Sequence, residues 1–394
     1  MSTSRHISRW FHRQAKDNLK TLRRQARRAL LHPGLAVAYA KYRRAVSQRD
    51  WATAKKLLVP LAGKAISSGD TRLVTELAHA AERLDEHELS TRWAYVNAGL
   101  MGNTRPTDWK GEDISDATLI VSFRESDRQG ISIGLEMTGY VAAAARRSAH
   151  CILIVEKRLV PLFARSLPGV EVVAYPCQPQ ARGNTRLVTA NALILKAVLG
   201  TLPVQVQAQT RPMLADAASC LSLRRQYQRG RDLPLVGLAW WSSHYGKDLP
   251  AISHWAELAK STNAIFVVVQ YGDVREDIEA LAAAVGPDRL IVDEGIDQMR
   301  DMDRFASQLC ALDGLITISN SGAHLAGALQ VPTLLIRDDL FRRAWSVLSD
   351  TTPWYPRTKV VGKDGRPWEA VFAEIRDLLP QIPRQPRSPS ISLS

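Results

Sequence analysis

The chain has 394 residues, of which 45% are hydrophobic and 23% charged, a composition typical of a globular protein with two or three domains. No apolar run reaches the length of about 18 residues that spans a membrane, and the N-terminal charges have no apolar stretch behind them. We therefore expect neither a transmembrane helix nor a secretory signal. Four Cys residues without metal or redox spacing indicate a reducing compartment: Cys151, Cys177, Cys220 and Cys310.

The positive charge is concentrated at the N-terminus. Of the formal net charge of +13, residues 1–44 supply twelve Lys or Arg residues against one acid, and the remaining sequence is nearly neutral. We predict a basic arm over residues 1–34, for which a solvated, partly helical tail is the simplest interpretation. Since Trp10 and Phe11 lie among the cations, peripheral contact of residues 1–30 with an anionic membrane is a second interpretation. Nucleic acid is not an expected partner, because no nucleic-acid-binding module follows.

Residues 35–104 have the pattern of an all-α helical region rich in Ala and Leu. The stretch AYAKYRRAVSQRDWATAKKLLVPLA predicts two short amphipathic helices, and DTRLVTELAHAAERLDEHELSTRWAYVNAGL predicts two more. Helical hairpins of this size resemble tetratricopeptide repeats. A plain helical cap on the following domain is an equally good interpretation.

Strands and helices alternate from residue 105 onward. Within residues 105–233 the order is strand, helix, strand, helix, strand, which predicts a Rossmann-like domain with a parallel sheet covered by helices. The expected strands are ATLIVSF (117–123), CILIVE (151–156) and VEVVAY (170–175), and the expected helices are GLEMTGYVAAAARRS (134–148) and KRLVPLFARSL.

Residues 234–380 repeat this alternation, with expected strands LVGLAW, AIFVVVQY, RLIVDE, GLITIS and PTLLIR. The predicted fold class is therefore α/β, with two doubly wound Rossmann-like domains that face a cleft and follow an all-α region. Ligands of such sheets bind at the carboxyl ends of the strands. The Pro-rich residues 381–394 predict a disordered tail.

One strand of the second series is followed at once by a polar turn and a helix of small residues, in the stretch DGLITISNSGAHLAGAL. A helix N-terminus has unpaired N–H groups and a partial positive charge, and small residues let an anion approach closely. Simple capping of the helix by Ser or Asn, beside a satisfied His, is the alternative. The candidate diphosphate site comprises Ser319, Asn320, Ser321, Gly322 and His324.

Two further polar loops follow strands of the same predicted sheet. In GLAWWSSHYGKDLP, Ser242, Ser243 and Lys247 come after a strand, and a Lys is a flexible point charge suited to a phosphate. In VVVQYGDVRED, Gln270 ends the next strand and is a candidate for lining a nucleotide pocket. A solvated loop and an ordinary strand-to-helix turn are the alternatives. The shared position at one edge of the sheet favours a binding site.

The segment RDDLFRRAWSVLSDTTPWYP combines cationic and aromatic side chains after the last predicted strand. Packing explains these aromatic residues about as well as stacking on a ligand does. The residues concerned are Arg342, Arg343, Trp345, Trp354 and Tyr355.

Three stretches together resemble the heptosyltransferase-like glycosyltransferases of family 9: DGLITISNSGAHLAGALQVPTLLI, WSVLSDTTPWYP and VGLAWWSSHYGKDLPAISHWAELAKSTNAIFVVVQYGD. The resemblance covers residues 105–380, and the nearest subgroup has helical repeats before the transferase. It implies a GT-B fold in which residues 105–233 bind the acceptor and residues 234–380 bind a nucleotide-sugar donor. It also implies sugar transfer, usually with inversion, that needs neither a metal nor a cofactor besides the donor.

By the same resemblance, His324 and the residues around it would contact the donor diphosphate, and Lys247 with Ser242 or Ser243 would assist. Such contacts stabilise the charge that builds on the leaving diphosphate.

The chain departs from the family where the general base is expected. Relatives commonly carry Gly-Asp in the loop after the first strand, whereas Ile131 follows Gly130 here. A general base must reach the acceptor hydroxyl. Asp127 is the predicted substitute, with Glu125 and Glu136 nearby; loss of the chemistry is the alternative.

We therefore expect a cytoplasmic glycosyltransferase with Asp127 and His324 as catalytic residues. Peripheral association with the inner face of the membrane is the second interpretation of its localisation. Its acceptor would be a cell-envelope glycan or a glycolipid such as lipopolysaccharide. A catalytically inactive GT-B scaffold that acts through its helical N-terminal region is the alternative.

Overall fold

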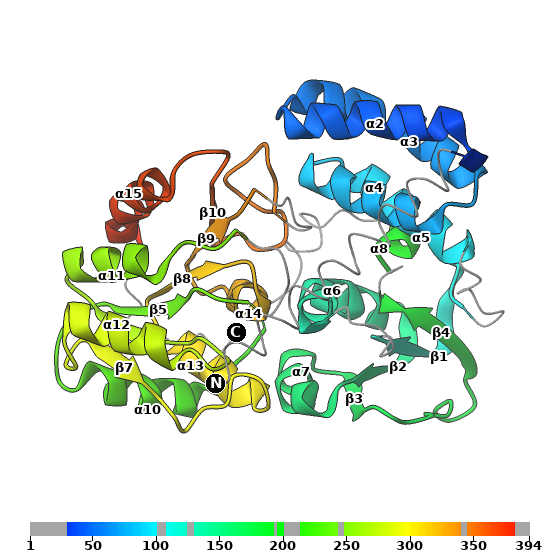
Figure 1. The fold of residues 1–394 in the computed structure, drawn as a ribbon. Coiled ribbons are helices and arrows are strands. Elements are labelled where there is room, and N and C mark those ends of the chain that lie inside the picture. The colour runs from blue at the N-terminus through cyan, green and yellow to red at the C-terminus, as the bar shows by residue number, and fades with distance from the viewer. Residues whose placement is uncertain are drawn as a thin grey trace, which may run out of the picture. The chain divides into compact units, whose positions relative to one another are not determined.

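The computed structural model describes residues 30–100, 108–123, 130–192, 195–200, 213–242, 248–339 and 345–382. The chain divides into two compact units, residues 1–103 and residues 104–394 (Figure 1). As far as they are described, the first unit is helical and the second contains two sheets. Within the described segments, no helix combines the length and the apolar character needed to cross a membrane.

The described part of the first unit consists of four helices, each packed against the next along the chain. Asp50 and Asp70 cap two of them, because their carboxylates accept hydrogen bonds of 3.0 Å from the N–H groups of Thr53 and Leu73. The predicted all-α region is confirmed, whereas its relation to tetratricopeptide repeats stays a prediction. The helices are α2 (Pro33–Ser47), α3 (Trp51–Ser67), α4 (Thr71–Arg83) and α5 (His87–Leu100).

The N-terminal half of the second unit, residues 108–200, contains a parallel sheet with the strand order β3-β2-β1-β4. The sequence pattern does not predict β4, because its residues RLVTAN are only alternately buried, as suits an edge strand. The strands are β1 (Ile114–Ser122), β2 (Ser148–Val155), β3 (Val170–Ala174) and β4 (Arg186–Asn191). The helices are α6 (Gly130–Ala145), η2 (Lys157–Leu159), α7 (Val160–Ser166) and α8 (Leu195–Leu199).

The C-terminal half, residues 213–382, contains a parallel sheet with the order β10-β9-β8-β5-β6-β7. Its central strands are buried at every residue, which explains their unbroken apolar sequences. The strands are β5 (Leu235–Ala239), β6 (Ile265–Val268), β7 (Leu290–Val292), β8 (Gly314–Ile318), β9 (Thr333–Arg337) and β10 (Thr358–Gly362). The helices are α10 (Ala217–Gln228), α11 (Ile252–Ser261), α12 (Arg275–Val285), α13 (Met302–Cys310), α14 (Ser321–Ala328), α15 (Trp368–Leu378) and η4 (Leu379–Gln381).

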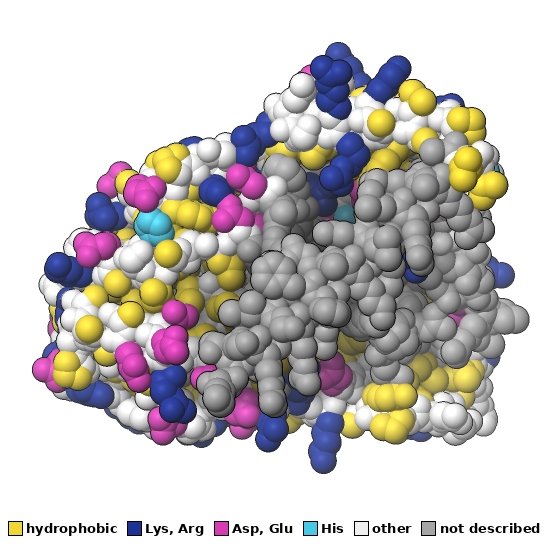
Figure 2. All heavy atoms as spheres, viewed as in Figure 1, with side chains coloured by type: hydrophobic (Ala, Val, Ile, Leu, Met, Phe, Trp, Pro, Cys, Tyr) yellow, Lys and Arg dark blue, Asp and Glu magenta, His cyan; other side chains and the backbone are white. Residues whose placement is uncertain are grey.

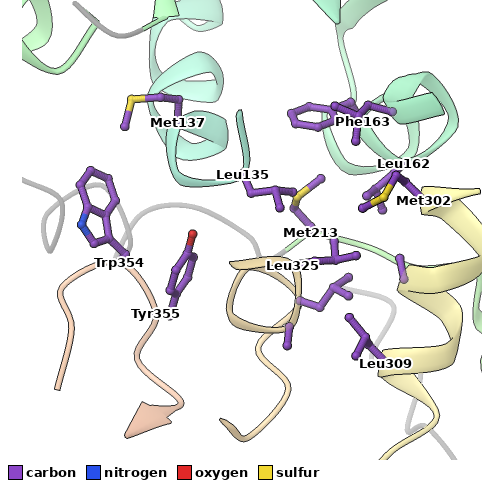
Figure 3. Close-up of a cluster of buried hydrophobic side chains, with 14 of the residues drawn as sticks. Leu135, Met137, Leu162, Phe163, Met213, Met302, Leu309, Leu325, Trp354 and Tyr355 are labelled. Carbon is purple, nitrogen blue, oxygen red and sulfur yellow. The ribbon is translucent and has the colours of Figure 1, made fainter. Parts of the chain in front are cut away.

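The two halves of the second unit share one apolar core. Helix α6 of the N-terminal half packs against α14 of the C-terminal half, and α7 packs against α13. Figure 3 shows Leu135 and Met137 of α6 in the same cluster as Leu325 of α14 and Tyr355. The predicted architecture, α/β with two doubly wound sheets after an all-α region, is confirmed. The shared core positions α6 directly opposite the helix that carries His324.

Gly327 permits the close approach of Tyr355 to α14. A Cβ atom at this position would lie 2.4 Å from Cγ of the Tyr355 ring, closer than van der Waals contact allows. The small-residue character of this helix is therefore a packing requirement.

Replacement of Gly327 by Ala should lower the free energy of unfolding by roughly 1–3 kcal/mol, because the ring has to move out of a filled core. Chemical denaturation measures this change. The matched control is Gly134→Ala in α6, where the added Cβ would meet the Phe123 ring at an ordinary 3.7 Å. The control should be neutral or stabilising by up to about 1 kcal/mol. Equal effects of the two substitutions would contradict the packing role of Gly327.

Candidate functional site

The candidate site lies at a change of direction in the C-terminal sheet. Strands β5 and β8 are neighbours, but β6 and β7 follow on one side of them and β9 and β10 on the other. Open α/β sheets bind ligands at such a switch point, beyond the carboxyl ends of the strands. The loop after β5 and the turn between β8 and α14 both begin there. The strand order therefore places the loop after β5 and the turn before α14 at one edge of the sheet, as the sequence predicts.

The turn after β8 is shaped by its polar side chains. Asn320 is the N-cap of α14, and its Oδ1 accepts a 3.0 Å hydrogen bond from the N–H group of Ala323. The Oγ atom of Ser319 accepts a 2.8 Å hydrogen bond from the indole of the buried Trp345. Ser321 is the first residue of α14 and is partly exposed. Ser319 and Asn320, both predicted to bind the ligand, thus stabilise the turn itself. The N-terminus of α14 that follows the turn has unpaired backbone N–H groups, which are donors for an anion.

Gly322 lies against this cap. A Cβ atom at position 322 would stand 3.2 Å from Oδ1 of Asn320 and 3.4 Å from the Phe305 ring. A larger residue would therefore press on the capping side chain.

His324 is buried and points toward the N-terminal half. Its Nδ1 atom lies 3.0 Å from the hydroxyl of Tyr355 and 3.3 Å from Oε1 of Glu136, which belongs to α6. Trp345 covers the imidazole, with ring centroids 5.0 Å apart and planes inclined by 33°. The His324 side chain is therefore held between one acid, one phenol and one indole.

The Glu136–His324 contact joins two ionisable groups in a place from which water is nearly excluded. Glu136 is 2% exposed and His324 is 6% exposed. A buried carboxylate is stable only when a donor or a cation compensates for lost hydration. An ionised Glu136 carboxylate only accepts hydrogen bonds and would require a hydrogen on Nδ1 of His324, whereas the Tyr355 hydroxyl can donate to the same atom or accept from it.

Tyr140, Trp354 and Lys196 form a further group of contacts, which joins α6, α8 and the segment after β9. The rings of Tyr140 in α6 and Trp354 have centroids 6.3 Å apart, and Nζ of Lys196 lies 5.6 Å from the Trp354 ring centroid. Trp345, Trp354 and Tyr355 are at most 1% exposed. The sequence left two interpretations of these aromatic residues, packing and stacking on a ligand. Their burial shows that they pack in the core.

Gln270 ties two strand ends together. Its Oε1 accepts hydrogen bonds of 2.8 and 2.7 Å from the N–H groups of Trp240 and Trp241, and its Nε2 donates to the carbonyl of Tyr271. Ser242, immediately beyond, is 8% exposed. Gln270 therefore positions the loop after β5.

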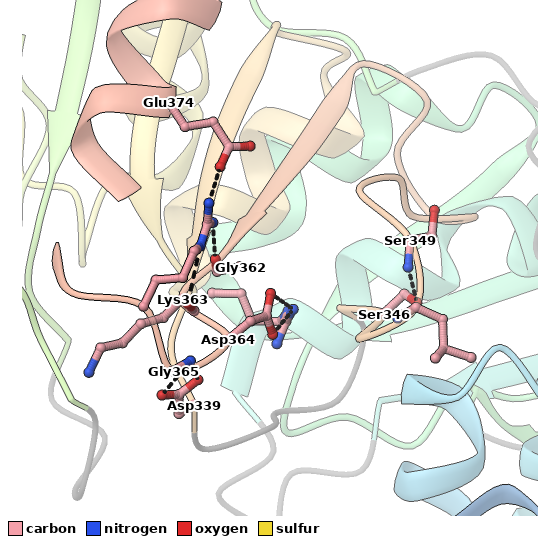
Figure 4. A network of polar contacts seen from close by, with 11 residues as sticks. Asp339, Ser346, Ser349, Gly362, Lys363, Asp364, Gly365 and Glu374 are labelled. Carbon is pink, nitrogen blue, oxygen red and sulfur yellow. Dashed lines mark hydrogen bonds and ion pairs between the residues drawn. The ribbon is translucent and has the colours of Figure 1, made fainter. Parts of the chain in front are cut away.

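A buried arginine lies at the end of β9, on the same edge of the sheet. Nη2 of Arg337 donates to both carboxylate oxygens of Asp364, at 2.8 and 3.0 Å. Figure 4 shows Asp364 within its network of polar contacts. Its Nε and Nη1 have no hydrogen-bond partner among the residues that the structure describes. These two donors are suited to an anionic oxygen.

A small pocket opens between the ends of β8 and β9 and helix α15. Ser319 is one of its walls, so the pocket adjoins the turn that precedes α14. Its lining residues are Asp248, Leu249, Ile318, Ser319, Ile336, Asp338 and Trp368.

Three of the predicted site residues, Asp127, Ser243 and Lys247, lie outside the described residues, as do Arg342 and Arg343. Glu136 is the acid that the structure brings to His324, and it is not among the predicted catalytic residues. Its signal in the sequence is a single charged residue within the otherwise apolar and small-residue helix GLEMTGYVAAAA. In the described segments, no three His, Cys, Asp or Glu side chains converge as a set of metal ligands.

Comparison with known proteins gives one curated relative and several solved structures, and no family model matches the chain. Protein FlbA of Caulobacter vibrioides is 25% identical over 288 residues, which are 69% of this chain and 48% of that protein. The chain thus spans about half the length of this relative.

The solved structures similar to this chain include the glycosyl transferase family 9 protein of Veillonella parvula, with 10% identity and a TM-score of 0.47 over 69% of this chain and 97% of that one. They also include two Escherichia coli proteins. The heptosyltransferase WaaC with ADP-2-deoxy-2-fluoro heptose has 12% identity and a TM-score of 0.44 over 67% of this chain and 99% of its own. The ADP-heptose lps heptosyltransferase II has 13% identity and a TM-score of 0.42 over the same shares.

Replacement of Glu136 by Ala should lower the free energy of unfolding by about 3–5 kcal/mol, because it removes one partner of a buried pair. Chemical denaturation of the second unit measures the loss, and a double-mutant cycle with His324→Ala measures the coupling of the two side chains. The control is Glu171→Ala, which breaks an ion pair with Arg182 between side chains 43% and 41% exposed. That loss should not exceed about 1 kcal/mol. Strictly additive effects of the Glu136 and His324 substitutions would contradict the pairing.

Proposed function

We propose that the chain is a glycosyltransferase that moves a sugar from a nucleotide-sugar donor to a cell-envelope glycan or glycolipid. The observation that carries this proposal is the contact between Glu136 and His324. It joins the N-terminal half to the first turn of α14, at the switch point of the C-terminal sheet. A reaction between a donor on one half and an acceptor on the other needs functional groups at this place.

The donor diphosphate would bind at the N-terminus of α14. Backbone N–H groups and the helix dipole favour an anion there, and small residues allow its approach. Lys247, Ser242 and Ser243 follow the neighbouring strand, and Arg337 ends another strand at the same edge. Together these groups would stabilise the negative charge that develops on the leaving diphosphate, a role that a metal ion plays in other enzymes.

Glu136 acts as a positioning residue in this mechanism. Because it is 2% exposed and already in contact with His324, it is not placed to meet an acceptor hydroxyl directly. Its carboxylate would fix the imidazole in the tautomer with hydrogen on Nδ1, which leaves Nε2 to bear the functional proton. Asp127 remains the residue proposed as general base on the acceptor. Resemblance of the motifs supports transfer without a metal and with inversion.

Donor binding tests the diphosphate site. Titration calorimetry with a panel of nucleotide-sugars, ADP-linked heptose included, should identify one donor that binds and is hydrolysed or transferred. His324→Ala and Lys247→Ala should each weaken its binding by roughly 10- to 100-fold, the value of a hydrogen bond to a charged group. Glu171→Gln, at an exposed and remote position, should leave binding unchanged. A chain that neither binds nor turns over any donor would overturn the proposal.

The general base is tested by turnover at saturating donor. Asp127→Asn should lower kcat by a factor of about 10²–10⁴ while donor binding is kept. Glu136→Gln keeps the shape of the side chain and should lower kcat through His324, again with little change in donor affinity. If Asp127→Asn has wild-type kcat and Glu136→Gln does not, the base is the Glu136–His324 pair.

A further inference from the structure

Tyr355 gives His324 a second polar contact besides Glu136. The Tyr355 hydroxyl and Oε1 of Glu136 lie 3.0 and 3.3 Å from the same atom, Nδ1 of His324. All three side chains are at most 6% exposed, so bulk water is nearly excluded from both contacts. Figure 2 shows charged side chains on the surface of the second unit, where water solvates them. The polar groups at His324 instead compensate one another for the hydration lost on burial.

These two contacts distinguish the two orientations of the imidazole. The last torsion of a His side chain has two broad minima, related by a half-turn of the ring. Such a half-turn of His324 would exchange Nδ1 with the carbon Cδ2. The hydroxyl and the carboxylate would then face a C–H group, and both polar contacts would be lost. The contacts therefore favour the orientation in which Nε2 is directed away from Tyr355 and Glu136.

Aromatic rings enclose the imidazole, but they do not select its orientation. The Trp345 ring centroid lies 5.0 Å from that of His324 at an inclination of 33°, and the Tyr355 ring lies 5.7 Å away at 75°. These are van der Waals contacts, which a half-turn of the imidazole leaves nearly unchanged. Selection of the orientation therefore falls to the hydroxyl and the carboxylate.

The position of the Tyr355 hydroxyl is itself fixed by the chain around it. Pro356 follows directly and biases the backbone of Tyr355 to an extended conformation. The Tyr355 carbonyl accepts a 3.0 Å hydrogen bond from the N–H group of Thr358, the first residue of β10. Its ring packs on Gly327, and Figure 3 shows its hydroxyl directed toward α6. A group that orients another side chain has to be held in this way.

We propose that Tyr355 is a positioning residue for His324. Its hydroxyl, together with Glu136, holds the imidazole in the orientation that leaves Nε2 for the donor diphosphate. A hydroxyl is suited to this role because it can donate to Nδ1 or accept from it, and so keeps its contact whichever nitrogen carries the hydrogen. The part played by the diphosphate rests on the proposed function, whereas the orientation of the ring does not.

NMR of the full chain with isotope-labelled His tests the orientation without donor or turnover. Wild-type His324 should give a single set of ring-nitrogen resonances, because one orientation is populated. Tyr355→Phe keeps the ring and removes the hydroxyl, and it should shift the Nδ1 resonance of His324. His324→Ala identifies these resonances among those of the nine His residues. Two sets of His324 resonances in the wild type, or an unchanged Nδ1 resonance in Tyr355→Phe, would contradict the positioning role.

Titration with inorganic pyrophosphate measures the consequence for the diphosphate site. Tyr355→Phe should weaken binding by roughly 2- to 10-fold, the value of one hydrogen bond between neutral groups. In a His324→Ala background the same substitution should have no further effect, because the hydroxyl acts only through the imidazole. A further loss in that background would overturn the inference, since Tyr355 would then affect the site by another route.

Tyr227→Phe is the matched control. Tyr227 is a buried residue of α10, outside the candidate site, and its hydroxyl donates a 2.6 Å hydrogen bond to Asp293. This variant should lose stability but keep the His324 resonances and the affinity for pyrophosphate, with circular dichroism showing both Phe variants folded. If Tyr355→Phe behaves in the same way, its hydroxyl is only structural and the inference is wrong. If the wild type binds neither pyrophosphate nor any donor, the proposed function fails, and the His324 resonances still decide the orientation of the ring.

Discussion

The constraint on which the rest of the second unit depends is the burial of Glu136 and His324 beside each other. Either side chain alone would be expensive to remove from water, and each compensates the other because they meet at 3.3 Å. Meeting requires that α6 and α14 pack closely, and Gly327 and Tyr355 show how tightly that region is filled. The polar contact and the apolar core therefore stabilise each other. The core excludes water from the contact, and the contact compensates both side chains for their lost hydration.

The polar residues at the carboxyl edge of the C-terminal sheet divide into two kinds. Asn320, Ser319 and Gln270 bond to neighbouring protein atoms and shape the strand ends. In the proposed diphosphate site, recognition of the anion would then fall to the helix N-terminus, to His324 and to the cations at the same edge of the sheet. Small polar side chains could thus be necessary to the proposed diphosphate site by shaping its backbone, without being ligands themselves.

Much of the secondary structure follows from the sequence, for a physical reason. Central strands of a parallel sheet are buried on both faces, so β5, β8 and β9 are unbroken apolar runs that any reader of the sequence finds. The turn SNSG before α14 is likewise a local feature, because the N-cap bond of Asn320 spans three residues. The edge strand β4 is not predicted, because only alternate residues of this strand are buried and its sequence is therefore not a continuous apolar run.

The sequence by itself determined the alternation of strands and helices, the concentration of cations at the N-terminus, and the place of His324 in the first turn of a helix at the sheet edge. Only the tertiary structure decided that Glu136 is the acid that faces His324, and that Trp345 and Tyr355 enclose the ring. These contacts join segments far apart in the chain. They depend on how α6 packs against α14 across a shared core, and no local period or spacing encodes that packing.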